Sequence, residues 1–540
     1  LNTRMMVQEI EESDYIISWG KNSASDDGPQ VMLHRIKEAQ KRGAKLIVID
    51  PRQEGLGKIA DWWIPITPGS DGALALAMLK LIIGSGRYDH EFIEKYTRGF
   101  EEFKTYLDTQ TMEQLSKWCG ISVTDIEKLT DIFCSTAKIP LVAYTGLEYQ
   151  LSAIQNNRAI FVLWAITGKL DAPGAIYLNA KGLETPKLFE IPEEDKPIGV
   201  DEFPLFYKFS GLGQFSRFPK AVLEDEPYPV RGLMILGGSP VLSFPDSKSW
   251  REAYKKLDCL IVLDRYFTED ARYADVVFPA CSLFEVPKAV PGPEGPHIVE
   301  PLIEPVGESK NDVLIMGAIA KKLGFGDKLP QTEEELRSWL LSGTAPYAGD
   351  FGAGAGQKKE KHYKKYETGE LRSDGKPGFP TPSGKLEICS TILEENGFVP
   401  YPEYKDIRSI SELAGEEYPF TMTSGARSNN RMGVFGANLD KIAEIEPYPF
   451  VDINEEDAKE IGIKDGDMVK VITPFADGTF KAKIRGIARH AIHIPHGGGS
   501  AYMAEPWKNG NVNDLCSLDY ADPMTGFVLI KSVPCRVEKV

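Results

Sequence analysis

The stretch Asp14-Tyr-Ile-Ile-Ser-Trp-Gly-Lys-Asn22 decides the fold, because its pattern predicts a buried strand that runs into a polar, glycine-containing turn. The following residues predict a helix from Pro29 to Arg42 and then a second buried strand over Lys45–Asp50. Pro68-Gly-Ser-Asp71 begins another helix. A strand–helix–strand unit with an acidic residue at the tip of its second strand is typical of nucleotide-binding folds.

The same arrangement occurs a second time. Gly232–Leu236 has the pattern of a buried strand and ends in the turn Gly237-Gly-Ser-Pro240, and Leu260–Asp264 predicts the next strand, again with a terminal acid. Two such units in one chain are a stronger signal than one. Neither first strand is followed by a G-x-G-x-x-G sequence, which disfavours a plain NAD dehydrogenase.

Short strands replace this pattern from about Glu417 onward. They are predicted over Pro419–Thr423, Met468–Ile472, Phe480–Ile484 and Ala491–Ile494, with one helix over Glu455–Ile461 between them. This pattern predicts a compact, mainly β domain that closes into a barrel. The whole chain is therefore expected to divide into an α/β nucleotide-binding domain at 1–185, a second one at 186–370, a bridging segment at 371–414 and a β-barrel domain at 415–540.

Composition excludes several classes of function. The chain has 540 residues and a formal net charge of −17, which argues against nucleic acid as a partner. No apolar run is long enough to span a membrane. The seven cysteines are scattered without any C-x-x-C pair, which indicates free thiols in a core rather than a disulfide, zinc or iron–sulfur pattern. The five lysines between Lys358 and Lys365 are expected to lie in a solvated loop.

Nine segments of the chain together resemble the dimethyl sulfoxide reductase family of molybdenum and tungsten enzymes, and they occur in the family's order. They are Trp19-Gly-Lys-Asn22, Ile49-Asp-Pro-Arg52, Ile66-Thr-Pro-Gly-Ser-Asp71, Gly146-Leu-Glu148, Gly237-Gly-Ser-Pro240, Asp264 with Thr268, Ser424-Gly-Ala-Arg427, His496-Gly497 and Asn511-Val-Asn513. Ser23 stands where the family usually has proline, and Ser239 where it usually has asparagine. The resemblance implies an α/β fold with two Rossmann-like nucleotide-binding domains and a C-terminal, mainly β barrel of the double-psi type.

The resemblance also implies the cofactor, a bis-(molybdopterin guanine dinucleotide) with molybdenum or tungsten. Carboxylates can accept hydrogen bonds from guanine or ribose, glycine-rich turns suit a pyrophosphate, and amide or imidazole groups suit the pterin. His490 and His493 are expected to be surface or structural residues. The implied cofactor-binding residues are Trp19, Gly20, Asn22, Asp50, Arg52, Pro68, Asp71, Gly146, Glu148, Gly237, Gly238, Ser239, Asp264, Thr268, Ser424, Gly425, Arg427, His496, Gly497, Asn511 and Asn513.

The implied function is that of the C-terminal part of a catalytic subunit with two-electron chemistry on a small substrate of the formate or sulfur oxyanion and polysulfide type. A non-redox hydratase of the same family is one alternative. A cofactor-free scaffold relative is another, although it would not need Asp50, Asp71, Asp264, His496 or Asn513. No metal ligand is expected within the chain. The metal ligand is expected upstream of Leu1. A four-iron four-sulfur cluster is expected either there or on an iron–sulfur electron-transfer subunit, and the expected location is the cytoplasm.

Overall fold

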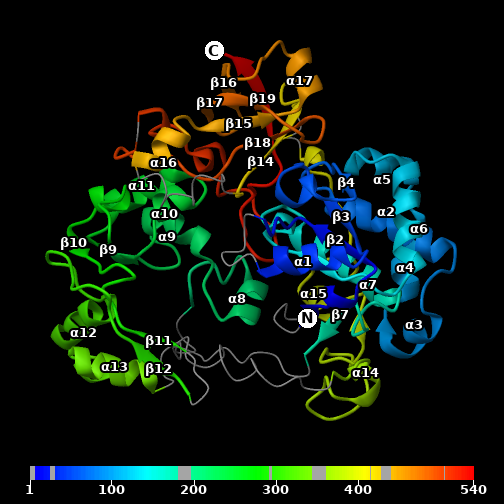
Figure 1. The fold of residues 1–540 in the computed structure, drawn as a ribbon, viewed down its shortest axis with the longest axis horizontal. Helices are drawn as coiled ribbons and strands as arrows, with labels where there is room; N and C mark the ends of the chain where they lie inside the picture. Colours follow the sequence, from blue (N-terminus) through cyan, green and yellow to red (C-terminus); the bar gives the residue numbers. More distant parts are fainter. Residues whose placement is uncertain are drawn as a thin grey trace.

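The computed structural model describes residues 6–24, 31–179, 196–290, 295–342, 361–410, 412–413, 415–426, 440–503 and 505–540. The described chain forms three parts (Figure 1). We call residues 6–179 with 361–410 the first lobe, residues 196–342 the second lobe, and the closed sheet with its connections after residue 415 the barrel. The barrel lies across one end of both lobes, above them in Figure 1.

A parallel sheet forms the centre of the first lobe. Its strands are β2 (Tyr15–Trp19), β3 (Lys45–Ile49), β4 (Trp62–Ile64) and β6 (Leu141–Ala143), in the order β4-β3-β2-β6. Alternate residues of β2 and β3 pack in two separate clusters, one with α2 (Asp71–Gly84) and α7 (Ala153–Ile166), the other with α1 (Val31–Lys41). Burial on both faces explains why these strands are nearly continuous apolar runs. The predicted strand–helix–strand unit is confirmed.

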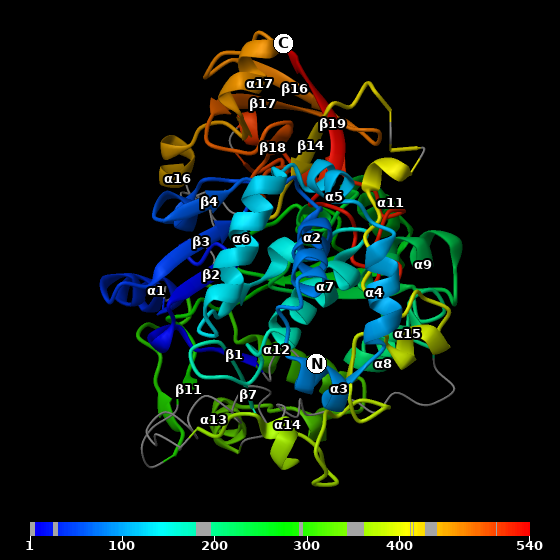
Figure 2. The same cartoon turned by 90° about the vertical axis from the view of Figure 1, so that its right-hand side faces the viewer.

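Further helices extend the layer around α2, as Figure 2 shows. They pack on α2 from the side away from the sheet, so that most residues of this helix are buried. The remaining elements of residues 6–179 are β1 (Met6–Gln8), which pairs with β7 (Ile176–Leu178), and α3 (His90–Tyr96), β5 (Thr97–Arg98), α4 (Phe100–Asp108), α5 (Met112–Cys119) and α6 (Val123–Ser135).

Residues 361–410 return to the first lobe after the second lobe is complete. They include α14 (Lys365–Thr368), β13 (Leu386–Glu387) and α15 (Thr391–Glu395), and β13 pairs with β5. Tyr366 and Phe379 join the core of the first lobe, and Lys365 is only 1% exposed. The prediction that all five lysines of this tract lie in a solvated loop is therefore wrong for Lys365, whose ammonium group is 2.6 Å from the buried Asp171 carboxylate.

The second lobe contains a smaller parallel sheet in the order β10-β9-β8, formed by β8 (Gly232–Leu236), β9 (Cys259–Asp264) and β10 (Val276–Pro279). Its core includes Trp250 of α11 (Ser247–Lys256) and also contains Met503 and Trp507 from the barrel side. The predicted strands are confirmed. The other elements are α8 (Pro204–Ser210), α9 (Phe218–Glu224), α10 (Pro240–Ser243), α11 (Ser247–Lys256), β11 (Lys288–Val290), β12 (His297–Val299), α12 (Asp312–Lys322) and α13 (Glu333–Leu341).

Six strands close the barrel in the order β14-β18-β15-β17-β16-β19. They are β14 (Phe420–Thr423), β15 (Phe450–Ile453), β16 (Met468–Ile472), β17 (Asp477–Ile484), β18 (Ala491–His493) and β19 (Val533–Lys539), with α16 (Asp440–Ile445) and α17 (Glu455–Glu460) between them. The predicted barrel is confirmed, and β15 and β19 are added to the predicted strands. No helix among the described residues is long and apolar enough to cross a membrane.

Candidate functional site

A cleft lies between the carboxyl ends of the first sheet and the barrel. Along the chain the strands run outward from β2 to β4, and β6 then joins the opposite side of β2, so the strand order reverses between β2 and β6. In open α/β sheets ligands bind outside the carboxyl ends of the strands at such a reversal. On this side the cleft is lined by Gly20, Lys21, Asn22, Asp50, Arg52, Pro68, Gly69, Asp71, Thr145, Gly146 and Gln150.

The turns after β2 and β6 touch each other at the reversal. The backbone N–H of Gly146 donates to the carbonyl of Gly20 at 3.0 Å. Gly20 has a φ of +63°, and a Cβ atom built on it would stand 3.1 Å from the Gly146 backbone. Glycine at position 20 therefore lets the two turns close on each other, which leaves backbone rather than side chains at this point of the cleft.

Asp71 is the buried acid of the cleft and the first residue of α2, with 5% of its surface exposed. The indole N–H of Trp19 donates to Oδ1 at 2.8 Å, and the amide of Gln150 donates to Oδ2 at 3.2 Å. Burial raises the pKa of Asp71 to about 6; the two hydrogen bonds oppose this and the charge of Asp50 adds to it. A perturbed carboxyl group at the edge of a cleft indicates a functional site.

The barrel supplies the opposite wall of the cleft. Ser424 and Gly425 follow β14, and the ammonium group of Lys531 donates to the Ser424 carbonyl at 2.7 Å. His493, the last residue of β18, also lines this wall. With Lys21 and Arg52, Lys531 places positive charge around a cleft that also contains two aspartates. Such a mixture suits a ligand that combines phosphate groups with hydrogen-bond donors.

The second lobe presents a comparable edge. Gly237 and Gly238 follow β8, Asp264 ends β9, and Gly237 has a φ of +57° with nothing within 4 Å of a Cβ built on it. The carboxylate of Asp264 accepts from the backbone N–H of Tyr266 at 3.0 Å. The side chain of Thr268 accepts from the backbone N–H of Ala271 at 3.3 Å. These contacts order the loops at the carboxyl ends of the second sheet.

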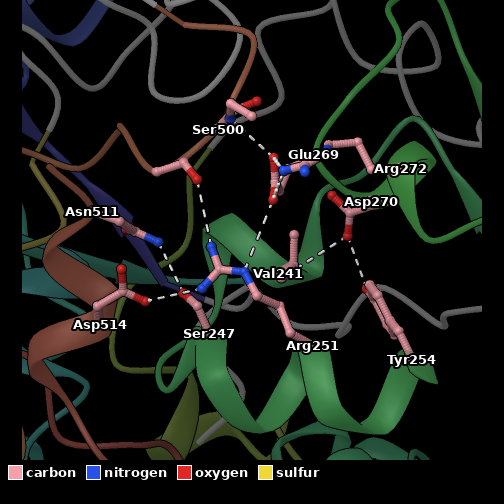
Figure 3. A network of polar contacts seen from close by, with 12 residues as sticks. Val241, Ser247, Arg251, Tyr254, Glu269, Asp270, Arg272, Ser500, Asn511 and Asp514 are labelled. Atoms are coloured by element: carbon pink, nitrogen blue, oxygen red, sulfur yellow. Dashed lines mark hydrogen bonds and ion pairs between the residues drawn. The ribbon is translucent and has the colours of Figure 1, made fainter. Parts of the chain in front are cut away.

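The side chain of Ser239 is hydrogen-bonded to a buried acid, Asp270. Its hydroxyl donates to the carboxylate of Asp270, which also accepts from the hydroxyl of Tyr254 at 2.8 Å and from the backbone N–H of Val241 at 3.2 Å. Burial raises the pKa of Asp270, although these hydrogen bonds oppose the shift. Tyr254, Asp270 and Val241 are seen together in Figure 3.

Asn511 and Asn513 join the barrel side to the second lobe. The amide of Asn511 donates to the hydroxyl of Ser247 at 2.9 Å, and the amide of Asn513 donates to the carbonyl of Leu242 at 2.8 Å. The side chain of Asn513 is also 3.4 Å from His496 Nδ1. Both asparagines are 2% exposed, and their buried amides join α10 and the first residue of α11 to the barrel side.

An arginine of α11 completes this junction, as Figure 3 shows. Arg251 lies 4.0 Å from Glu269 and 3.8 Å from Asp514, and the Glu269 carboxylate accepts from the backbone N–H of Ala501 at 3.1 Å. The polar network therefore fixes the position of the second lobe relative to the chain that leaves the barrel.

The predicted residues thus fall into two groups. Gly20, Asn22, Asp50, Arg52, Pro68, Asp71, Gly146, Ser424 and Gly425 line the cleft, and Trp19 lies directly behind Asp71. Glu148 lies nearby, where burial raises its pKa and Lys531 lowers it. Gly237, Gly238, Ser239, Asp264, Thr268, Asn511 and Asn513 lie at the second lobe or its junction with the barrel, with His496 beside Asn513 and Gly497 next in the chain. Arg427 lies outside the described residues.

The cleft lining also includes residues that were not predicted, among them the polar side chains of Lys21, Gln150, His493 and Lys531. Lys21 stands inside a turn that the sequence did mark, and Gln150 lies close to Gly146 and Glu148. His493 and Lys531 carried no such signal, and His493 was expected to be a surface or structural residue. In the part of the chain that the structure describes, no group of three His, Cys, Asp or Glu side chains is placed to hold a metal ion.

Comparison with protein families identifies the chain. The model described as "Molybdopterin oxidoreductase" matches residues 2–322, across both lobes, and the model described as "Molydopterin dinucleotide binding domain" matches residues 421–534, across the barrel. The chain belongs to the molybdopterin oxidoreductase family. This is the dimethyl sulfoxide reductase family of enzymes indicated by the sequence, and the mixed α/β fold with a closed C-terminal barrel agrees with it.

Curated relatives of this family member are longer than the chain. Acetylene hydratase of Syntrophotalea acetylenica is 27% identical over 90% of the chain and 70% of the relative. The F420-dependent formate dehydrogenase subunit alpha of Methanocaldococcus jannaschii is 29% identical over 91% and 72%. The thiosulfate reductase molybdopterin-containing subunit PhsA of Salmonella typhimurium is 24% identical over 86% and 65%. The chain therefore spans about two thirds to three quarters of the length of these relatives.

A solved structure shares the fold. The structure of acetylene hydratase from Pelobacter acetylenicus superposes with a TM-score of 0.81 over 99% of this chain and 79% of that chain, at 23% sequence identity. At this identity the likeness concerns the fold alone.

Proposed function

We propose that the chain binds a bis-(molybdopterin guanine dinucleotide) with molybdenum or tungsten and forms part of the catalytic subunit of an oxidoreductase. The observation that carries the proposal is the cleft at the strand-order reversal, where Asp50 and Asp71 face a wall supplied by the barrel. We also propose that the two lobes are Rossmann-like nucleotide-binding units, that the barrel is of the double-psi type, and that the domains divide at 1–185, 186–370, 371–414 and 415–540.

The groups that line the cleft suit one guanine nucleotide. Asp71 and Asp50 offer acceptors for the N1 and N2 donors of guanine or for ribose hydroxyls. The close glycine turns at Gly20 and Gly146 leave backbone groups next to the ligand, and Arg52 offers a cation for a phosphate. Asn22, Pro68, Ser424 and Gly425 complete the walls.

The second nucleotide would lie at the carboxyl edge of the second sheet. Gly237 and Gly238 supply an open backbone turn, and Asp264 supplies an acid at the carboxyl end of β9, comparable with Asp50, which directly follows β3. His496, Asn511 and Asn513 lie between this edge and the barrel. Because the amides of both asparagines already join the barrel to the second lobe, they would act by fixing the shape of this second site.

When bound, the cofactor would supply four sulfur donors to the metal and allow a two-electron exchange with a small substrate. The described residues would hold the nucleotide ends and close the lobes around it. We further propose an iron–sulfur electron-transfer partner, a cytoplasmic location and a substrate of the formate or sulfur oxyanion and polysulfide type. A hydratase reaction on the same cofactor is the second candidate, and dye reduction in the presence of formate would oppose it.

The direct test is the nucleotide content of the purified protein. The chain would be produced in a host that makes the cofactor, the protein hydrolysed in acid, and the released GMP and the fluorescence of oxidised pterin quantified per chain. The proposal predicts two nucleotides per chain, and predicts that Asp71→Asn and Asp264→Asn each lower this content. A folded chain with neither pterin nor GMP would contradict the proposal and favour a cofactor-free scaffold.

A further inference from the structure

The turn after β3 is joined to the barrel by a short antiparallel bridge. The backbone N–H of Gln53 donates to the carbonyl of Gly486 at 2.8 Å, and the N–H of Ala488 donates to the carbonyl of Pro51 at 2.8 Å. Arg52 lies between them, opposite Ile487. This bridge ties the two walls of the cleft together at the residue that offers a cation to the ligand.

The side chain of Arg52 ends on a histidine of the barrel. Arg52 Nη1 is 2.8 Å from Nε2 of His493, and Nδ1 of His493 is 3.1 Å from Oδ2 of Asp452. A guanidinium group only donates hydrogen bonds, so Nε2 of His493 must accept. The ring proton then lies on Nδ1, and this N–H donates a hydrogen bond to Asp452, which fixes one neutral tautomer of His493.

The surroundings of His493 keep it neutral. His493 and Asp452 are both 2% exposed. Burial and the charge of Arg52 lower the pKa of His493 to about 4, although Asp452 raises it, and the charge of Lys531 lowers it further. Burial alone would raise the pKa of Asp452, but the hydrogen bond of His493 and the charges of Arg52 and Arg485 hold it below its ordinary value. The Asp452 carboxylate is 3.3 Å from Arg485.

The charge of Arg52 is therefore not paired directly with Asp452. A neutral imidazole stands between the two groups, and both Arg52 and His493 line the cleft. Nε of Arg52 is buried and has no hydrogen-bond partner among the residues that the structure describes. A buried N–H donor without a partner is costly, so its presence at the cleft indicates that a ligand supplies the acceptor.

We propose that His493, held by Asp452, is a positioning residue that orients the Arg52 guanidinium toward a phosphate group of the bound nucleotide. The inference rests on the proposed function for the identity of the ligand. It assigns to His493 a role that acts only through Arg52, and it assigns to Asp452 the role of fixing the His493 tautomer. A carboxylate behind a histidine orients metal-bound imidazoles in the same way.

The test uses titration calorimetry of the cofactor-free chain with two probes, GDP and guanosine. His493→Phe should weaken GDP binding about tenfold, the effect of one charge-assisted hydrogen bond, and should leave guanosine binding unchanged because guanosine has no phosphate. In the Arg52→Met variant the added His493→Phe change should have no further effect. His493→Gln should restore most of the affinity, since its amide can accept from Arg52 and donate to Asp452.

Gln53→Ala is the matched control, because Gln53 lies in the same bridge but its side chain is outside the Arg52–His493–Asp452 contacts. Thermal melting of each variant confirms that it is folded. Equal loss of GDP and guanosine affinity in His493→Phe, or additive effects of the two substitutions on GDP binding, would overturn the positioning role. If the wild-type chain binds ADP as tightly as GDP, and both affinities depend on His493 to the same degree, the positioning role stands and the guanine assignment is overturned. If the chain binds none of these probes, both the positioning role and the guanine assignment are overturned.

Discussion

Replacement of Asp71 by asparagine should stabilise the cofactor-free chain at neutral and alkaline pH. Asp71 is 5% exposed, and burial raises its pKa to about 6 from an ordinary value of 3.8. The folded chain therefore holds a carboxylate in a place that disfavours its charge. Asparagine keeps an acceptor for the Trp19 indole and removes the charge, so the variant avoids this cost.

The size of the effect follows from the pKa shift. A shift of about two units corresponds to about 3 kcal/mol between the two protonation states. Because the pKa is higher in the folded chain than in the unfolded chain, the folded chain binds more protons between these values, and the free energy of unfolding of the wild type falls as pH rises from about 4 to about 6. The loss is complete above that range. Rearrangement of the Gln150 amide should cost the variant about 1 kcal/mol, which leaves a net gain of about 2 kcal/mol at alkaline pH.

Urea unfolding of the wild type and Asp71→Asn at about pH 8 and about pH 4.5 measures this difference. We expect the variant to be more stable at the higher pH, with most of the advantage gone at the lower one, and to bind guanosine more weakly. If Asp71 lowers the stability of the folded chain but is needed to bind guanosine, its presence indicates selection for ligand binding rather than for stability. A variant that is less stable at pH 8, or whose advantage is the same at both pH values, would refute the reasoning.

Three further substitutions test the fold and both nucleotide edges. Lys365→Met removes the ammonium group 2.6 Å from Asp171, in a pair whose side chains are 1% and 0% exposed, and should lower the free energy of unfolding measured in urea by about 3–5 kcal/mol. The same change at the exposed neighbour, Lys364→Met, should alter that free energy little, and equal stability of the two variants would refute the buried pair. Gly20→Ala brings a Cβ atom to 3.1 Å from Gly146 and should abolish guanosine binding in calorimetry. Gly43 also has a positive φ but nothing within 4 Å of a Cβ atom built on it, so Gly43→Ala should retain guanosine binding. Normal guanosine binding by Gly20→Ala would count against the close turns. Tyr254→Phe removes a hydrogen bond that lowers the pKa of Asp270, so this pKa should rise further. Thermal melting at two pH values should then show that the variant loses more stability than the wild type as pH increases. A difference in melting temperature between variant and wild type that does not depend on pH would argue against this contact.

The sequence predicted the strands that are buried within the parallel sheets, because burial leaves a run of apolar residues in the sequence. Strands β2, β3 and β9 are buried within parallel sheets and were visible as apolar runs. Strand β15 was missed because Asp452 interrupts its apolar run, and β19 because Pro534 counts against a strand. Lys365 was expected in solvent because its partner, Asp171, is distant in sequence.

The candidate site was predictable where the residues sit in turns that follow strands. Gly20 and Asp50 come directly after β2 and β3, and Gly146 follows β6 by three residues, so the topology alone brings them to one edge. His493 could not be found in this way, because its partner Arg52 lies 441 residues away and the contact depends on the docking of the barrel. The tertiary roles of Asn511 and Asn513 depend in the same way on the second lobe.

A crystal structure of the cofactor-loaded chain tests the central claim most directly. The account predicts one guanine nucleotide in the cleft between the first lobe and the barrel, with the base or ribose hydrogen-bonded to Asp71 or Asp50 and a phosphate next to Arg52. A loaded chain whose cleft contained only water, with the nucleotide bound elsewhere, would contradict it.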